Sequence, residues 1–159
     1  MNPLLREYFL PDTQSTEALG ALLADRLSGG ATIYLEGDLG SGKTTFVRGA
    51  LHGLGYRGIV KSPTFTLVEP YELAHIKVFH FDLYRLEDPE ELDWIGIRDF
   101  FQKDCVSFIE WPDKGQGLLP NPDLKLSFLP SVGGRRAMIS GSSDTGQKII
   151  HTLHGSNLE

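Results

Sequence analysis

Residues 37–44 read GDLGSGKT, which matches the eight-position phosphate-binding loop of P-loop proteins. Gly37 and Gly42 stand at the required spacing, and Lys43 and Thr44 follow the second glycine. Glycines let the backbone curl so that successive N–H groups point at phosphate oxygens, because a Cβ would obstruct that path. Lys43 can then reach the β and γ phosphates, and Thr44 can offer its hydroxyl to Mg²⁺. The stretch therefore predicts a nucleotide-binding loop.

The segments on either side of this loop support that interpretation. Residues 31–36 (ATIYLE) form a short apolar run typical of a strand, and residues 45–54 (TFVRGALHGL) carry apolar side chains at helical spacing. Strand, glycine-rich loop and helix in this order are the context that the motif requires. The alternative is a loop that merely connects a strand to a helix. The nucleotide contacts expected from the loop are Asp38, Leu39, Gly40, Ser41, Gly42, Lys43, Thr44 and Thr45.

Size, charge and composition narrow the class of protein. A chain of 159 residues with 40% hydrophobic residues suits one globular domain spanning residues 1–159. The formal net charge of -6 disfavours direct binding to nucleic acid or to an anionic membrane. The single cysteine, Cys105, cannot form an internal disulfide, and we expect it to be a buried structural thiol. With neither a signal peptide nor a membrane-spanning stretch in view, we expect a cytoplasmic protein.

The remaining apolar runs predict an α/β fold. The strands that we expect outside the loop region lie at residues 6–10, 66–71, 77–84, 105–110, 124–129 and 136–140, the last two as an antiparallel pair. The helices that we expect are one with Asp12 or Thr13 as its N-cap that ends at 28–30, one within 86–101 with Asp88 as its N-cap, and a terminal helix or strand at 145–154. Together they predict a single-domain P-loop NTPase-like fold, with a mostly parallel central sheet, antiparallel edge strands and helices on both faces.

Two of the predicted strands carry an acid near their C-terminal end, Asp82 in residues 77–84 and Glu110 in residues 105–110. Ligands of parallel sheets bind at that end of the strands, where the phosphate loop also lies. Either acid could therefore face a metal ion or the attacking water. Glu110 is the stronger candidate for a Walker B-type metal acid because its run is more uniformly apolar, and Asp82 is the rival. For Asp82 the alternative is a solvated aspartate at a strand end.

Two further features adjoin the expected site, and a third observation concerns the histidines. Thr64 follows the loop helix, where many P-loop proteins have a segment that closes onto Mg²⁺, so it is a candidate switch residue; an ordinary Ser-Pro turn fits equally well. Trp111 follows Glu110 and could shield the site from water, or simply pack on the end of the sheet. The five histidines show no metal-ligand spacing, so we do not expect a zinc site.

Four segments, in this order, closely resemble the TsaE (YjeE) family: GDLGSGKTTF, KSPTFTLVEPY, FHFDLYRLEDPEELDWIGIRDFF and IEWPDKGQGLLP. The resemblance covers residues 10–136. The family comprises bacterial ATPases required for threonylcarbamoyladenosine synthesis on tRNA. The resemblance implies a small mixed α/β P-loop domain that binds ATP and Mg²⁺ and acts with the TsaB and TsaD proteins. Their product would be N6-threonylcarbamoyladenosine at position 37 of tRNAs that read ANN codons, and hydrolysis would support repeated turnover.

The resemblance also implies roles for single residues. Lys43 matches the family's phosphate-binding lysine, and Thr44 and Glu110 match its two magnesium ligands. Asp82 matches an aspartate needed for hydrolysis. The implied catalytic set is therefore Lys43, Asp82 and Glu110.

Other implied roles lie around this set. Thr64 falls in the family's switch-like SPT segment, and Trp111 belongs to its Glu-Trp pair. The adenine-side contacts that the resemblance implies come from the start of the first helix and from a later turn, and they are Pro11, Thr13, Gly134 and Arg135.

Alternatives to a partner-stimulated ATPase follow from the same residues. No residue is an obvious arginine finger in cis, although Arg85 and Arg98 are possible, so we expect weak hydrolysis by the isolated protein. A nucleotide-gated binding module, whose hydrolysis is incidental, is the main alternative. A small-molecule kinase would need an arginine-bearing lid that the sequence does not suggest, and a GTPase would need an Asn-Lys-x-Asp string that is not present.

Overall fold

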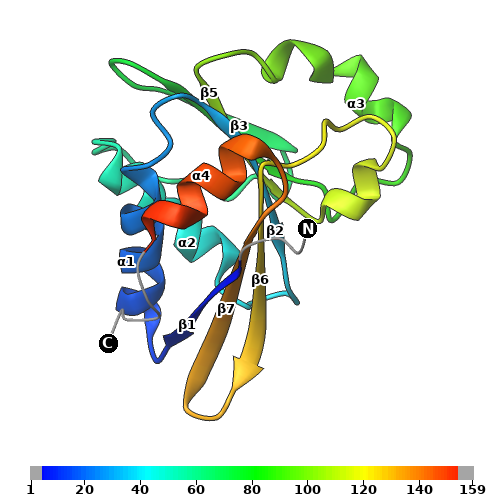
Figure 1. Cartoon of the computed structure of the whole chain (residues 1–159). Coiled ribbons are helices and arrows are strands. Elements are labelled where there is room, and N and C mark those ends of the chain that lie inside the picture. The colour runs from blue at the N-terminus through cyan, green and yellow to red at the C-terminus, as the bar shows by residue number, and fades with distance from the viewer. Residues whose placement is uncertain (1–4, 154–159) are drawn as a thin grey trace.

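The computed structural model describes residues 5–153, whose strands form a single seven-stranded sheet (Figure 1). The strand order is β1-β7-β6-β2-β5-β4-β3. The central strands β6, β2, β5 and β4 run parallel, whereas β1, β7 and β3 pair antiparallel with their neighbours. This confirms the predicted parallel centre with antiparallel edges. The strands are β1 Leu5–Leu10, β2 Ala31–Glu36, β3 Val68–Glu72, β4 Lys77–Asp82, β5 Cys105–Glu110, β6 Leu124–Ser131 and β7 Gly134–Gly141.

Helical segments cover both faces of the sheet, as predicted. Three α-helices share one apolar core with the sheet: α1 Thr13–Ala24, α2 Lys43–Gly53 and α4 Asp144–Thr152. A smaller apolar cluster lies on the other face of β4 and β5, beneath α3 Glu90–Trp94 and the 3₁₀ helices η1 Ile97–Phe100 and η2 Pro112–Gly115. None of the helices within residues 5–153 combines the length and the apolar character needed to cross a membrane.

The first helix begins where its capping residues dictate. The carboxylate of Asp12 accepts the backbone N–H of Ser15 at 2.8 Å, and the Ser15 hydroxyl accepts the N–H of Asp12 at 3.2 Å. This reciprocal capping box satisfies two N–H groups that the start of a helix leaves without partners. Of the two N-caps that the sequence allowed, the structure has Asp12, and Thr13 is the first helical residue.

Helices α1 and α2 cross at two glycines, and this contact positions the site. A Cβ on Gly20 would lie 2.2 Å from the carbonyl oxygen of Phe46, and one on Gly49 would lie 2.1 Å from that of Glu17. Only glycine allows the two backbones to approach this closely. As a result, the start of α1 lies beside the phosphate loop that leads into α2.

The helix predicted within residues 86–101 is wrong in its extent. The side chain of Asp88 accepts the N–H of Glu90 at 2.9 Å, but the N-cap is Pro89 rather than the predicted Asp88, and α3 begins at Glu90. The helix ends at Trp94, and Gly96 adopts a left-handed conformation with φ 73° before η1. Tertiary packing explains the break, because the aromatic rings that follow turn onto β4: Phe100 lies 4.8 Å from Phe79, centroid to centroid.

Other boundaries differ by a few residues. Helix α1 ends at Ala24 rather than at 28–30, and β3 starts at Val68 because Leu67 is left-handed with φ 69°. The predicted antiparallel pair is confirmed but longer, with a tight turn at residues 132–133. The terminal segment is the helix α4, and the predicted end at His154 lies outside the described residues. Cys105 is partly exposed, not buried as predicted.

Candidate functional site

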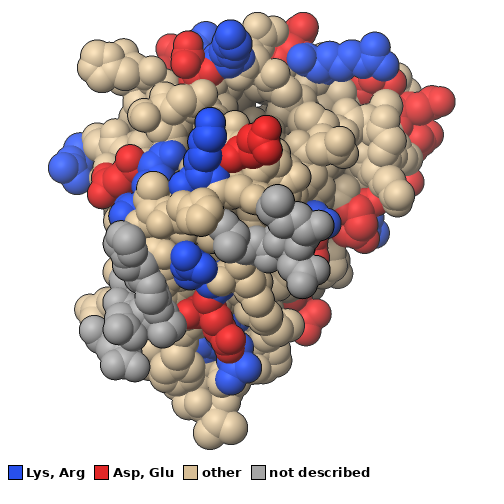
Figure 2. Space-filling model, viewed as in Figure 1, with Lys and Arg blue, Asp and Glu red and all other residues tan. Residues whose placement is uncertain are grey.

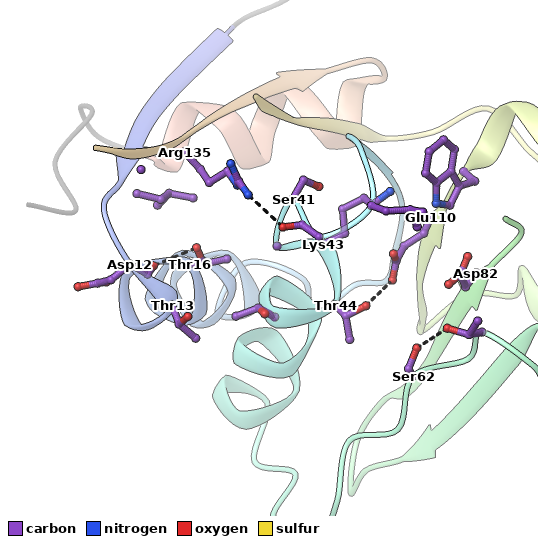
Figure 3. Close-up of a pocket in the computed structure, with 18 of the residues that line it drawn as sticks. Asp12, Thr13, Thr16, Ser41, Lys43, Thr44, Ser62, Asp82, Glu110 and Arg135 are labelled. Carbon is purple, nitrogen blue, oxygen red and sulfur yellow. Dashed lines mark hydrogen bonds between the residues drawn. The ribbon is translucent and has the colours of Figure 1, made fainter. Parts of the chain in front are cut away.

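A pocket of about 580 Å³ lies at the C-terminal end of the parallel strands (Figure 3). It is bounded by the phosphate loop, the start of α1, the tips of β4 and β5 and the start of β7. Nearly all of the predicted site residues line it: Pro11, Thr13, Leu39, Gly40, Ser41, Gly42, Lys43, Thr44, Thr45, Thr64, Asp82, Glu110, Trp111, Gly134 and Arg135. Asp38 instead lines an adjoining cavity, which shares Trp111 with this pocket.

The phosphate loop has the backbone that an anion site requires. Gly40 and Gly42 adopt left-handed conformations with φ 75° and 106°, which a residue with a Cβ disfavours. Gly42 is the N-cap of α2 and offers no side chain to the first N–H groups of that helix. The Ser41 hydroxyl is buried without a hydrogen-bond partner among the described residues. Free N–H groups and a positive helix end are suited to phosphate.

Lys43 is folded over the loop. Its Nζ donates to the carbonyl oxygen of Gly37 at 2.6 Å and lies 4.0 Å from the centre of the Trp111 ring. Burial lowers the pKa of Lys43, although the negative charges of Glu110 and Asp82 act in the opposite direction. A cation in such a desolvated position gains strongly from a bound anion, so the amine is well placed to meet a phosphate group.

The two strand-tip acids lie side by side. Strands β4 and β5 are parallel neighbours whose register places Asp82 directly opposite Glu110, and both side chains are buried. The Thr44 hydroxyl donates to Oε2 of Glu110 at 3.1 Å, which joins the acid to the start of α2. Figure 3 shows Thr44 and Glu110 pointing toward each other, with Asp82 beside them. The predicted catalytic residues are thus brought together.

The side chain of Asp82 is held by a backbone N–H two residues further along the chain. Its carboxylate accepts the N–H of Tyr84 at 3.0 Å. Burial raises the pKa of Asp82, and the nearby charge of Glu110 raises it further. An acid with a raised pKa at the edge of a polar pocket can accept a hydrogen bond from water and take up a proton.

The donor set at the strand tips fits Mg²⁺ better than a transition metal. Within residues 5–153, no three His, Cys, Asp or Glu side chains are arranged to hold a metal ion by themselves. Thr44 and Glu110 supply two hard oxygen atoms near the loop. Mg²⁺ commonly takes one or two protein oxygens and completes its shell with phosphate and water.

Thr64 and Trp111 stand at the rim of the pocket. The hydroxyl of Thr64 lies 2.7 Å from that of Ser62, a residue that also lines the pocket. Trp111 is left-handed with φ 58°, and its ring contacts both the amine of Lys43 and the ring of Tyr84, whose centroid is 5.0 Å away. Non-glycine residues in this conformation concentrate at functional sites.

The opposite end of the pocket is formed by the β1–α1 junction and the start of β7. Arg135 Nη2 donates to the carbonyl oxygen of Gly40 at 3.1 Å. A Cβ on Gly134 would lie 2.4 Å from the carbonyl oxygen of Leu10, so glycine lets the two segments meet. Sequence reasoning missed Thr16 here, a buried residue of α1 that lines the pocket.

Sequence reasoning also missed His80. This fully buried residue of β4 lies with its Nε2 2.6 Å from Oε2 of Glu110. A signal was present, because alternation along the strand places His80 and Asp82 on the same face.

Comparisons with known proteins agree with the resemblance. The family profile described as threonylcarbamoyl adenosine biosynthesis protein TsaE matches residues 10–138. The tRNA threonylcarbamoyladenosine biosynthesis protein TsaE of Haemophilus influenzae is 44% identical over 147 residues, which cover 89% of this chain and 93% of that protein. The Bacillus subtilis protein of the same name is 34% identical over 92% of this chain and 84% of its own length.

A solved structure agrees as well. The crystal structure of Bacillus subtilis YdiB superposes with a TM-score of 0.80 at 25% sequence identity, covering 96% of this chain and 95% of that one. The predicted membership is therefore confirmed. This chain belongs to the TsaE family of proteins for the biosynthesis of threonylcarbamoyladenosine in tRNA.

Proposed function

We propose that this protein is an Mg²⁺-dependent ATPase that acts with TsaB and TsaD to form N6-threonylcarbamoyladenosine at position 37 of tRNAs that read ANN codons. Hydrolysis would support repeated turnover of that complex. One observation carries the proposal: a single pocket holds the phosphate loop, the free start of α2, Lys43 and the paired acids Asp82 and Glu110. Membership of the TsaE family supports the pathway.

Each residue then has a defined task. The loop amides and Lys43 bind the phosphates and stabilise negative charge on their oxygens. Thr44 and Glu110 would hold Mg²⁺, which when bound neutralises charge on the β and γ phosphates. Asp82 orients the attacking water by accepting its hydrogen bond, and it takes up the proton that the water loses.

An arginine finger, a common stabiliser of the charge on the γ-phosphoryl group, is not evident among the described residues. Among the residues that line the pocket within 5–153, Arg135 is the single arginine, and it is bonded to the loop carbonyl of Gly40. Of the two finger candidates, Arg85 lies over the ring of Phe65 at 4.5 Å and Arg98 belongs to η1. An arginine finger accelerates hydrolysis by about 10³ to 10⁵. We therefore expect slow hydrolysis by this chain alone and stimulation by TsaB and TsaD.

The test is ATP turnover by the wild type and by Lys43→Ala, with Mg²⁺, alone and with purified TsaB and TsaD. We expect stimulation of the wild type by the partners and no turnover by Lys43→Ala in either condition. Lys148→Ala is the matched control, since Lys148 is an exposed residue of α4 outside the pocket. Equal wild-type turnover with and without the partners would contradict the proposed stimulation.

A nucleotide-gated binding module is the second candidate. The observation that favours it is apolar surface next to Thr64: Phe65 is 82% exposed and Ile59 is 80% exposed. Such side chains commonly anchor protein partners. Asp82→Asn discriminates between the two functions, because a module that still binds ATP should remain functional, whereas a required ATPase should not.

Two further expectations concern tRNA binding and the location of the protein in the cell. On the face drawn in Figure 2, basic and acidic side chains are interspersed rather than gathered into one basic surface. That the chain does not itself bind tRNA stays an expectation from its formal net charge of -6. The cytoplasmic location stays a prediction from the sequence.

A further inference from the structure

His80 occupies an unusual position for a histidine. It is fully buried on the face of β4 that packs in the core shared with α1 and α2, and its register partners on β5 and β2 are the apolar residues Phe108 and Ile33. Its Nε2 lies 2.6 Å from Oε2 of Glu110. Its Nδ1 is buried and has no hydrogen-bond partner among the described residues. An apolar side chain would fill this row without leaving a nitrogen unpaired.

The hydrogen bond defines which nitrogen carries the hydrogen. An ionised carboxylate only accepts hydrogen bonds, so Nε2 of His80 donates to Glu110. Nδ1 has no hydrogen-bond partner among the described residues, so the bond from Nε2 is the one that fixes the ring. His80 therefore acts on Glu110 as a fixed N–H donor.

The two oxygens of Glu110 are used differently. Oε2 accepts both the His80 Nε2–H and the Thr44 hydroxyl, at 2.6 Å and 3.1 Å. No described residue hydrogen-bonds Oε1, and Glu110 lines the pocket. A carboxylate held by one oxygen presents the other at a fixed place. A donor from within the sheet keeps that arrangement even when the Thr44 hydroxyl turns to another ligand.

We propose that His80 is a positioning residue for the magnesium site, holding Oε2 of Glu110 so that Oε1 faces the metal. This inference rests on the proposed Mg²⁺-dependent function. Residues that hydrogen-bond a metal ligand orient it, and their loss typically weakens metal binding by 10-fold to 100-fold. His80 would thus set the affinity for Mg²⁺ without contacting either the ion or the nucleotide.

The experiment measures Mg²⁺ affinity by calorimetric titration of Mg²⁺ into protein saturated with a non-hydrolysable ATP analogue. We expect His80→Leu to weaken Mg²⁺ binding by about tenfold or more, because the donor is lost. His80→Gln, which retains an N–H donor, should restore most of the affinity. Affinity for the analogue in EDTA should be the same in all three proteins, since His80 does not line the pocket.

A second readout separates positioning from a merely structural role. In a Glu110→Gln background, His80→Leu should cause little additional loss of Mg²⁺ affinity, because the two residues act through one carboxylate. The thermal unfolding midpoint of each variant checks the fold. If His80→Leu does not fold, His80→Asn takes its place with the same expectation, because its shorter amide does not reach Glu110.

Unchanged Mg²⁺ affinity in His80→Leu, with a wild type that does bind Mg²⁺ and nucleotide, would overturn this inference and leave the proposed function intact. An additive loss in the Glu110→Gln background would overturn it as well. A wild type that binds no Mg²⁺ in the presence of the analogue would instead overturn the proposed function, and this inference with it.

Discussion

The two ends of the pocket are built in different ways. At the phosphate end, Lys43, Asp82 and Glu110 are 4%, 8% and 4% exposed, and they extend from the first turn of α2 or from the tips of central strands. At the opposite end, Pro11 and Thr13 are exposed, and Arg135 contributes one hydrogen bond from the start of β7 (Figure 3). The phosphate end is therefore fixed by the sheet before any ligand binds. Substitutions should have effects that decline from this end to the other.

After the loss of turnover expected for Lys43→Ala, the largest effect is expected from Asp82→Asn. The amide keeps an oxygen for the Tyr84 N–H but cannot accept a proton from the attacking water. We expect turnover in the presence of TsaB and TsaD to fall by about 10² to 10⁴. Binding of Mg-ATP, measured by calorimetry, should change by less than about threefold, because Asp82 is not one of the expected Mg²⁺ ligands. A fall in turnover that follows a matching loss of binding would contradict the role in orienting water.

Thr44→Val should have the next largest effect. Valine has nearly the same shape but no hydroxyl, so it removes one proposed Mg²⁺ ligand together with the hydrogen bond to Glu110. We expect the Mg²⁺ concentration that gives half-maximal turnover to rise by about tenfold. Thr44→Ser, which retains the hydroxyl, is the matched control and should stay close to the wild type. Similar values for the two variants would show that the hydroxyl does not bind the ion.

The phosphate end was also the more predictable from sequence. The loop is specified locally, since its glycines and the Lys-Thr pair must stand at fixed spacing, and β2 and β5 have the predicted bounds 31–36 and 105–110. Asp82 and Glu110 could be placed because parallel strands bring their C-terminal ends to one edge. The neighbouring register of β4 and β5, which sets the two acids directly opposite each other, depends on long-range pairing that no local pattern encodes.

Predictions from the sequence were wrong or incomplete where tertiary contacts determine the structure. His80 has the pattern of an ordinary core residue, and only the pairing of β4 with β5 shows that its nitrogen meets Glu110. The break of the predicted helix at Gly96 follows from aromatic packing against β4, which periodicity does not register. The direction of Asp38, toward the adjoining cavity, depends on the path of the loop backbone. The chemistry of the local motifs could be predicted from the sequence, whereas the tertiary neighbours of single side chains could not.

A smaller effect of Asp82→Asn concerns stability. Burial raises the pKa of Asp82 in the folded protein, so at neutral pH the ionised carboxyl disfavours folding. This cost disappears as the pH falls through the raised pKa, because the carboxyl becomes protonated. Asp82→Asn should therefore increase the free energy of unfolding by about 1 kcal/mol at neutral pH. Urea denaturation would measure the gain, which should shrink in acid below the carboxyl's ordinary pKa range. A loss of stability at neutral pH would contradict this reasoning.

The smallest effect is expected at the far end of the pocket, from Arg135→Ala. Its hydrogen bond to Gly40 is partly exposed, and such a bond contributes about 1 kcal/mol or less. We expect the dissociation constant for ATP to rise by at most about fivefold, with turnover at saturating ATP unchanged. Arg136→Ala is the matched control, because the neighbouring Arg136 pairs with Glu7 at 2.7 Å and does not line the pocket. A rise in the dissociation constant far beyond about fivefold would mean that the far end of the pocket, and not only the phosphate end, dominates nucleotide binding.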